Sequence, residues 1–228
     1  MQTILVTGAS GGIGSAIMEA LSALPHIQII AVDKENRAQT GGGIIFENAD
    51  ISSHQPIEKL RDKTTKQFPK IDWLVASHGF IDTETNLEKE RHEDIEATFS
   101  INTLSVIYLT QLFLPHFKAD GGIIALSSTA GLKGNGRYAA YSASKAAVNN
   151  FMQAMARNRP ELNFITICPG PTSTPMREKI AGDAATKQNP SAIAQTVLGI
   201  VLGKTDYKSG DIIVVRDGQE ELVSRLDS

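Results

Sequence analysis

The sequence is poor in the features that mark several classes of protein. Cys168 is its single cysteine among 228 residues, so an intrachain disulfide is excluded and a reducing compartment is favoured. Within FITICPG this cysteine is predicted to be a buried small hydrophobe rather than a nucleophile. No uninterrupted apolar run is long enough to span a bilayer. A net charge of −3 without a dense Lys/Arg block argues against nucleic acid as the main partner.

The first residues, MQTILVTG, pass directly from an apolar run into glycines. A signal peptide would instead carry a charged lead and a cleavage region. From these absences together we expect a cytoplasmic protein that binds neither nucleic acid nor membrane, and we assign no metal site.

The residues that are present suit a globular α/β domain. Hydrophobic side chains make up 41% of the sequence and charged ones 21%, which is enough apolar material for a sizeable core. Short β-branched runs alternate with segments of helical spacing, a pattern typical of a parallel sheet with helices on both faces. Strands are expected at 3–7, 27–33, 43–48, 72–77, 122–128, 163–168 and 211–215. Helices are expected at 13–24, 56–67, 88–118, 139–157 and 190–203.

No composition shift, linker or internal repeat divides the chain, so residues 1–228 are predicted to form a single domain. The connection from Asp33 to Ile44 is barely long enough for a crossover, which usually takes about a dozen residues or more. We expect a truncated helix or a loop there.

The segment TILVTGASGGIGSAIMEAL passes from a strand through glycines into an amphipathic helix. Gly8, Gly12 and Gly14 give the spacing G-x-x-x-G-x-G, a variant of the dinucleotide fingerprint, although glycines alone would also suit a plain strand-to-helix turn. Glycine lets a pyrophosphate approach the backbone, and the helix that follows directs its N–H groups at the phosphates. Asp33 ends the next strand at the spacing of a carboxylate that accepts hydrogen bonds from ribose hydroxyls. We therefore predict a dinucleotide site.

The charge of Asp33 favours NAD over NADP, because a 2′-phosphate would meet a like charge at close range. Lys34 and Arg37 follow at once, and they would hold such a phosphate if they folded back over it. The interpretation that we prefer is a solvated loop. NAD is the predicted cofactor, with NADP less favoured.

Further motifs follow in a fixed order. After TGASGGIG come Asp50-Ile51, Asn102, Ser128, the segment Tyr141-Ser-Ala-Ser-Lys145 and the loop PGPTSTPM. In content and order these residues resemble the short-chain dehydrogenase/reductase family, and the resemblance extends from Thr3 to about Gly218. It implies an α/β fold of the Rossmann type, a doubly wound seven-stranded parallel sheet with strand order 3-2-1-4-5-6-7.

The resemblance also implies roles for individual residues. The catalytic set falls on Asn102, Ser128, Tyr141 and Lys145. Asn102 is expected to position a water that links Lys145 to solvent, and Lys145 to bind the nicotinamide ribose as well. The cofactor-binding set is Gly8, Ser10, Gly12, Ile13, Gly14, Asp33, Asp50, Ile51, His78, Gly79, Tyr141, Lys145, Pro169, Gly170, Thr172 and Thr174.

Tyr141 and Lys145 stand four residues apart in AAYSASKAAV, which places them on one face of a helix. A phenol with a pKa of about 10 is a poor proton shuttle at neutral pH. We expect the Lys145 ammonium and an oxidised nicotinamide to favour the phenolate and lower the pKa of Tyr141. Ser128 would donate a hydrogen bond to the reacting oxygen. The alternative is a half-buried aromatic ring beside the stem of a surface lysine.

Two segments depart from the family pattern. The usual Asn-Asn-Ala-Gly after the fourth strand reads Ala-Ser-His-Gly at 76–79, so the bracing of the sheet is expected to be weaker or differently made. His78 would lie close to the cofactor and tune the pH dependence, or serve as a hydrogen-bonded structural residue, which we prefer. Residues 217–219 read Asp-Gly-Gln where the family usually has Asp-Gly-Gly, so the family's packing of the tail and its subunit contact are not carried over to this chain.

The substrate side is predicted from composition. The segment PMREKIAGDAATKQNP, with Gly182, is expected to form a mobile lid. The expected pocket wall is Thr129, Leu132, Tyr138, Met176 and Ile180, a mixed surface that suits a small alcohol or carbonyl compound without naming one.

We therefore predict an NAD(H)-dependent oxidoreductase that interconverts a secondary alcohol and a carbonyl, with Tyr141 as the acid/base. One alternative is an NADPH-preferring carbonyl reductase of the same fold. The other is a non-catalytic, NAD-sensing binding protein, which would have no need of a proton relay. The resemblance also suggests a homo-oligomer, a dimer or tetramer, built through the helices at 88–118 and 139–157.

Overall fold

The structure, a computed structural model, describes residues 1–35, 43–181 and 188–226. Arg37, Gly182 and most of the connection from Asp33 to Ile44 lie outside the described residues, as does part of the predicted lid. The centre of the fold is one sheet with the strand order β3-β2-β1-β4-β5-β6-β7-β8. The strands are β1 (Gln2–Thr7), β2 (Ile27–Asp33), β3 (Ile44–Asn48), β4 (Ile71–Ala76), β5 (Phe117–Leu126), β6 (Asn163–Pro169), β7 (Ile212–Arg216) and β8 (Gln219–Ser224).

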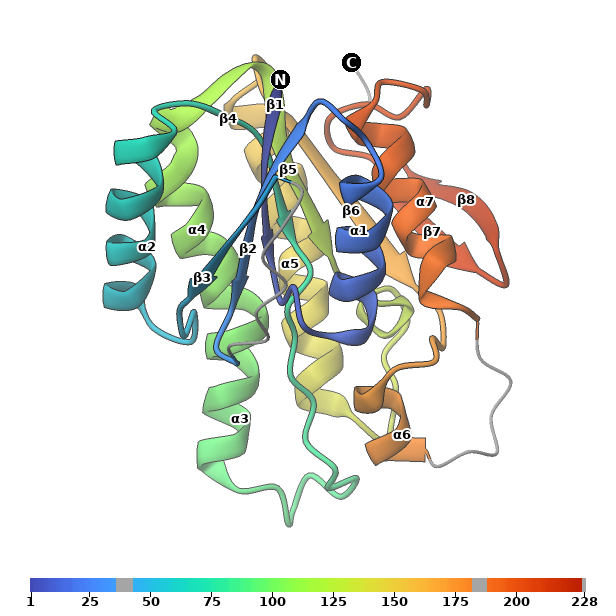
Figure 1. The fold of residues 1–228 in the computed structure, drawn as a ribbon. Helices are drawn as coiled ribbons and strands as arrows, with labels where there is room; N and C mark the ends of the chain where they lie inside the picture. Colours follow the sequence, from blue (N-terminus) through green and yellow to red (C-terminus); the bar gives the residue numbers. More distant parts are fainter. Residues whose placement is uncertain (36–42, 182–187, 227–228) are drawn as a thin grey trace.

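Strands β1 to β7 are parallel in the order 3-2-1-4-5-6-7, as predicted, and β8 is an antiparallel addition on the outer side of β7. Helices cover both faces of the sheet (Figure 1). The helices are α1 (Gly12–Ser22), α2 (His54–Gln67), α3 (His92–Phe99), α4 (Ser105–Phe113), α5 (Ala139–Asn158), α6 (Pro175–Ala181) and α7 (Pro190–Val201).

The core has two layers, one on each face of the sheet. On β1, Ile4 and Val6 pack into the cluster under α1 and α7, whereas Leu5 packs into the cluster under α2, α4 and α5. Successive side chains of a strand point to opposite faces, so a strand covered on both sides must be apolar at every position. This explains why the continuous apolar runs of the sequence form the centre of the sheet.

The stretch expected as one helix over 88–118 is divided in the structure. A π-helical turn, Ser100–Leu104, separates α3 from α4, and a short 3₁₀ turn, Leu114–His116, leads into β5. His92–His116 is the one helical stretch in the described part of the chain that is long and apolar enough to cross a membrane. Here Leu109 and Phe113 are fully buried in the core, so this is a core helix.

A two-residue turn joins β7 to the added strand β8. Asp217 has a φ of 53° and Gly218 a φ of 75°, and the turn brings Arg216 opposite Gln219. Positive φ at both central residues is the geometry of a type I′ hairpin turn, for which Asp-Gly is a preferred pair. The change from Asp-Gly-Gly to Asp-Gly-Gln thus still allows the hairpin.

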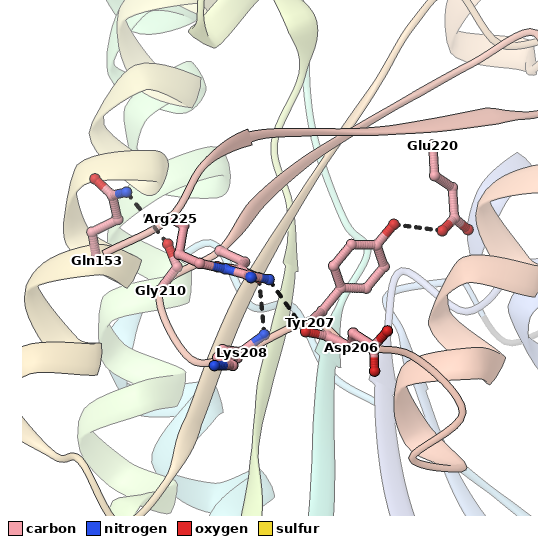
Figure 2. Close-up of polar contacts among 8 residues, drawn as sticks. Gln153, Asp206, Tyr207, Lys208, Gly210, Glu220 and Arg225 are labelled. Carbon is pink, nitrogen blue, oxygen red and sulfur yellow. Dashed lines mark hydrogen bonds and ion pairs between the residues drawn. The ribbon is translucent and has the colours of Figure 1, made fainter. Parts of the chain in front are cut away.

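Polar contacts fasten β8 and the residue after it to the body of the domain (Figure 2). Arg225 binds Asp211 through two nitrogens, Nε to Oδ1 at 2.9 Å and a terminal nitrogen to Oδ2 at 2.6 Å. From β8 itself, Glu220 accepts a hydrogen bond from the hydroxyl of Tyr207, which Figure 2 shows. It also accepts one from the hydroxyl of Thr196. The side chain of Asp211 is fully buried, with 0% exposed. The pairing with Arg225 therefore neutralises a carboxylate that water does not reach.

We predict that Arg225→Met destabilises the fold, because it leaves the buried Asp211 carboxylate without its cation. The matched control is Arg159→Met. Arg159 is similarly exposed, 37% against 40% for Arg225, but its partner Glu161 is 56% exposed. Such surface pairs contribute little to stability. In urea unfolding the midpoint should fall clearly for Arg225→Met and stay near the wild-type value for Arg159→Met; equal shifts would contradict the account.

Candidate active site

The loops at the carboxyl ends of the strands surround a large cavity of about 1670 Å³. Ligands of open α/β sheets bind at this edge. Every predicted cofactor-binding residue lines the cavity, as do Ser128, Tyr141 and Lys145, whereas Asn102 does not. The expected pocket wall also lines it: Thr129, Leu132, Tyr138, Met176 and Ile180.

The glycine turn after β1 forms one end of this cavity. Gly8 has a φ of 68°, in the left-handed region that favours glycine. A Cβ on Gly14 would lie 1.9 Å from the carbonyl oxygen of Gly8, and a Cβ on Gly12 would lie 2.6 Å from the methyl group of Thr174. The backbone is therefore packed too closely for side chains here. A cradle of this kind fits the diphosphate of a dinucleotide.

Two carboxylates and a hydroxyl line the cavity together with the glycine cradle. Asp33, at the end of β2, accepts hydrogen bonds from the backbone N–H groups of Ser10 at 2.9 Å and Glu35 at 3.2 Å. The backbone N–H of Ser52 lowers the pKa of Asp50 below its usual value. The Oγ of Ser10 is shielded from water and has no hydrogen-bond partner among the described residues. These features fit a ligand that brings its own donors and acceptors.

Tyr141 and Lys145 lie at the other end of the cavity, on the first two turns of α5. The Nζ atom of Lys145 is 6.0 Å from the centre of the Tyr141 ring. Lys145 is only 4% exposed, and its Nζ donates a hydrogen bond to the carbonyl oxygen of Leu126 at 2.9 Å. Burial lowers the pKa of Lys145 to about 8. The lysine is thus a buried cation and not a surface charge whose stem covers the ring.

The pKa of Tyr141 differs from the expectation. Burial raises it above the usual value, although a hydrogen bond with Ser128 acts in the opposite direction. The ammonium of Lys145 is bonded to Leu126, so within the chain itself it does not outweigh the desolvation of the phenol.

Burial is also the main reason that the pKa of Cys168 rises to about 11, so this fully buried thiol is poorly suited to act as a nucleophile.

Asn102 lies in the π-helical turn, behind the wall of the cavity. Its side-chain amide donates to the carbonyl oxygen of Phe80 at 2.8 Å and to Ser144 Oγ at 3.0 Å, and its Oδ1 accepts from the backbone N–H of Phe80 at 2.7 Å. The residue is 1% exposed. Through these bonds Asn102 joins the loop after β4 to α5, the helix that carries Tyr141 and Lys145.

A model of the short chain dehydrogenase family matches residues 2–185. The chain belongs to this family. It is 28% identical over 237 residues to the 3-oxoacyl-[acyl-carrier-protein] reductase of Thermotoga maritima, a match that covers 94% of this chain and 96% of that protein. As a short-chain dehydrogenase, it is an oxidoreductase that acts on CH–OH groups with NAD(P).

Solved structures of short-chain dehydrogenases have the same fold. One from Burkholderia cenocepacia, in complex with NADP, superimposes with a TM-score of 0.84 at 26% identity and covers 95% of this chain and 97% of its own. A 3-ketoacyl-(acyl-carrier-protein) reductase from Brucella melitensis, complexed with NADH, gives a TM-score of 0.87 at 20% identity over 95% and 97%. Related folds thus hold either cofactor.

His78 stands where the short-chain dehydrogenase motif has alanine, and it forms a hydrogen-bonded bridge. Its Nδ1 is 2.6 Å from the hydroxyl of Thr7 at the end of β1, and its Nε2 is 2.6 Å from the hydroxyl of Ser105 at the start of α4. Ser77 adds a bond from its Oγ to the carbonyl oxygen of Thr7 at 2.6 Å. These bonds brace the strands in place of the missing amides. No pattern in the sequence points to Thr7 or Ser105, because each lies in an ordinary strand or helix.

The neighbours of His78 decide its tautomer. Ser105 Oγ donates its proton to the carbonyl oxygen of Ile101 at 2.6 Å, so it accepts from His78, and Nε2 carries the hydrogen. Nδ1 then accepts from Thr7. A second proton on the ring would face the Thr7 hydroxyl and the nearby Lys145. Burial first, and then the charge of Lys145, lower the pKa of His78 to about 3. The imidazole is therefore neutral in the folded protein.

This neutral histidine predicts a loss of stability in acid. In the unfolded chain His78 has its ordinary pKa of 6.5 and binds a proton below that pH. In the folded protein it stays neutral down to about pH 3. Its stabilising contribution is present above pH 6.5 and falls by about 2 to 3 kcal/mol between pH 6.5 and pH 4.5. Urea unfolding at these pH values should show a shallower pH dependence for His78→Asn than for the wild type. His26→Asn, at an exposed position, is the control and should keep the wild-type slope.

Proposed function

We propose that this short-chain dehydrogenase is an NAD(H)-dependent enzyme that interconverts a secondary alcohol and a carbonyl, with Tyr141 as the acid/base. One observation carries the proposal. A single cavity has the glycine cradle and Asp33 at one end, and Ser128, Tyr141 and buried Lys145 at the other. A dinucleotide held by the cradle would extend toward the tyrosine.

In this proposal the residues of the chain handle the proton. The nicotinamide, when bound, supplies or accepts the hydride. Tyr141 takes the proton of the alcohol in oxidation and returns it in reduction, and Ser128 holds the reacting oxygen by a hydrogen bond. Lys145 adds positive charge beside the phenol. Asn102 acts as a positioning residue, since its amide joins the Phe80 backbone to Ser144 on α5.

The preference for NAD rests on Asp33. Its carboxylate is held at the end of β2 by two backbone N–H groups. A 2′-phosphate placed beside the ribose would meet this charge. The competing proposal, an NADPH-preferring carbonyl reductase, would use Lys34, which lines the same end of the cavity. The structural relatives include complexes with NADP and with NADH, so the affinity for both cofactors has to be measured.

Two further proposals follow from the sequence. A reducing, cytoplasmic compartment is supported by the single cysteine, Cys168, which is free and buried. A homo-oligomer built through the helical stretches 88–118 and 139–157 stays a prediction, which size-exclusion chromatography with light scattering would test.

Tyr141→Phe should reduce turnover by about 10² to 10⁴-fold, because the ring remains while the proton that it transfers is lost. NAD binding, measured by isothermal titration calorimetry, should stay within about twofold of the wild type. The matched control is Tyr108→Phe, at a tyrosine whose ring packs against His54 and does not line the cavity. Retained turnover in Tyr141→Phe would contradict the assignment. Tight NAD binding by the wild type without turnover on a broad panel of alcohols and ketones would instead indicate a sensor.

Asp33→Ala should relax the choice of cofactor. We expect the affinity for NADH to fall and that for NADPH to rise, each by about tenfold, because the hydrogen bonds to the ribose and the repulsion of a 2′-phosphate are lost together. Dissociation constants for both cofactors, measured in parallel, give the answer. Asp62→Ala, on the exposed side of α2, is the control. A wild type that already prefers NADPH would favour the competing proposal.

A further inference from the structure

Arg177 lines the cavity and has no partner there. It lies on α6, and its Nε is shielded from water without a hydrogen-bond partner in the described part of the chain. Within residues 1–35, 43–181 and 188–226, no ion pair or side-chain hydrogen bond joins its guanidinium to another residue. A guanidinium offers five donors in a planar fork, and a buried donor without an acceptor is unfavourable. The unpaired group therefore favours binding of a ligand that brings an acceptor.

The position of α6 shows where such a ligand would lie. The helix begins directly after Thr174, whose methyl group touches the glycine turn at Gly12, and the Thr174 hydroxyl accepts from the backbone N–H of Arg177 at 3.2 Å. At the other end, the hydroxyl of Tyr138 donates to the carbonyl oxygen of Ile180 at 3.0 Å. Arg177 is thus midway along a bridge from the cradle of the diphosphate to the tyrosine end of the cavity.

The charges of this wall also favour an anion. Lys133 and Lys179 also line the cavity, and no acidic residue from 129–138 or from α6 does. The acidic residues that line the described cavity all come from other segments of the chain. They are Asp33, Glu35, Asp50, Asp217, Glu220 and Glu221. An arginine fork pairs best with the oxygens of a phosphate or a carboxylate.

We propose that Arg177 binds an anionic oxygen group at the centre of the cavity. This inference rests on the proposed function and adds a recognition residue to it. The group has two possible sources: the diphosphate of the dinucleotide, or a carboxylate or phosphate carried by the substrate. The chemistry of recognition is the same in both.

The test uses Arg177→Met, which keeps an apolar stem, and Arg177→Lys, which keeps the charge. Lys66→Met, at an exposed lysine on α2 that does not line the cavity, is the control for net charge. All are made in the Tyr141→Phe background, so that no turnover consumes the probes. The affinities of NADH and ADP-ribose are measured by calorimetry. Acetoacetate and its neutral ester, ethyl acetoacetate, are then titrated into the NADH-loaded protein.

If the diphosphate is the source, Arg177→Met should weaken NADH and ADP-ribose equally, by about tenfold or more, while Lys66→Met leaves them unchanged. If the substrate is the source, dinucleotide binding should stay constant. Acetoacetate should then lose about tenfold in affinity and the ester should not. In both cases Arg177→Lys should recover part of the loss.

Unchanged binding of all four probes in Arg177→Met would overturn the inference, and so would an equal loss in Lys66→Met. Either result leaves the proposed function intact, because the parent protein still binds NADH. If the parent binds neither NADH nor ADP-ribose, the proposed function fails first, and the inference fails with it.

Discussion

Lys145 brings an ammonium group into the interior, where only 4% of the residue is exposed, and its surroundings are built to hold it. A buried charge without partners is costly and tends to lose its proton. The carbonyl oxygen of Leu126 accepts from Nζ, and the hydroxyl of Ser127 donates to the carbonyl oxygen of Lys145. A Cβ on Gly131 would lie 2.7 Å from the backbone of Lys145, so the turn after β5 packs directly on α5. The buried cation thus depends on close contact between a strand end and a helix.

The same burial sets the protonation of the site. It lowers the pKa of Lys145 to about 8 and raises that of Tyr141. The chain alone therefore leaves the phenol less acidic than a lysine one turn away would suggest. In the proposed function, the positive charge of an oxidised nicotinamide must lower the pKa of Tyr141 further. Proton transfer would then be coupled to binding of the oxidised cofactor. This coupling would limit acid/base chemistry to a loaded enzyme.

His78 illustrates how a departure from a family pattern can be compensated. Its ring connects the end of β1 to Ser105 at the start of α4. The Ser105 hydroxyl in turn donates a hydrogen bond to the carbonyl oxygen of Ile101, in the π-helical turn that carries Asn102. A single neutral side chain therefore joins the end of β1, next to the glycine turn, to the turn that holds Asn102. The alanine of the family motif could make no such bond, and the smaller Ser77 beside it still reaches the backbone of Thr7.

The fold could be predicted largely from local patterns. Continuous apolar runs such as IQIIAVD mark parallel strands because both faces are covered, and the periodicity of α1 and α7 marks their buried stripes. The strand β8, QEELVS, could not be found this way, since all of its residues except Ser224 are exposed and carry no apolar period. The Asp217-Gly218 pair was the available signal for it. The π-helical turn has no such signal, because it depends on how the helix packs on α5.

The sequence by itself determined the order of the elements, the glycine turn and the spacing of Tyr141 and Lys145, since each of these follows from neighbours along the chain. Tertiary structure alone decided how far Lys145 is buried, which way the pKa of Tyr141 moves and which partners His78 has. Those properties depend on desolvation and on groups distant in sequence, such as Thr7 and Ser105, that only the folded sheet brings together.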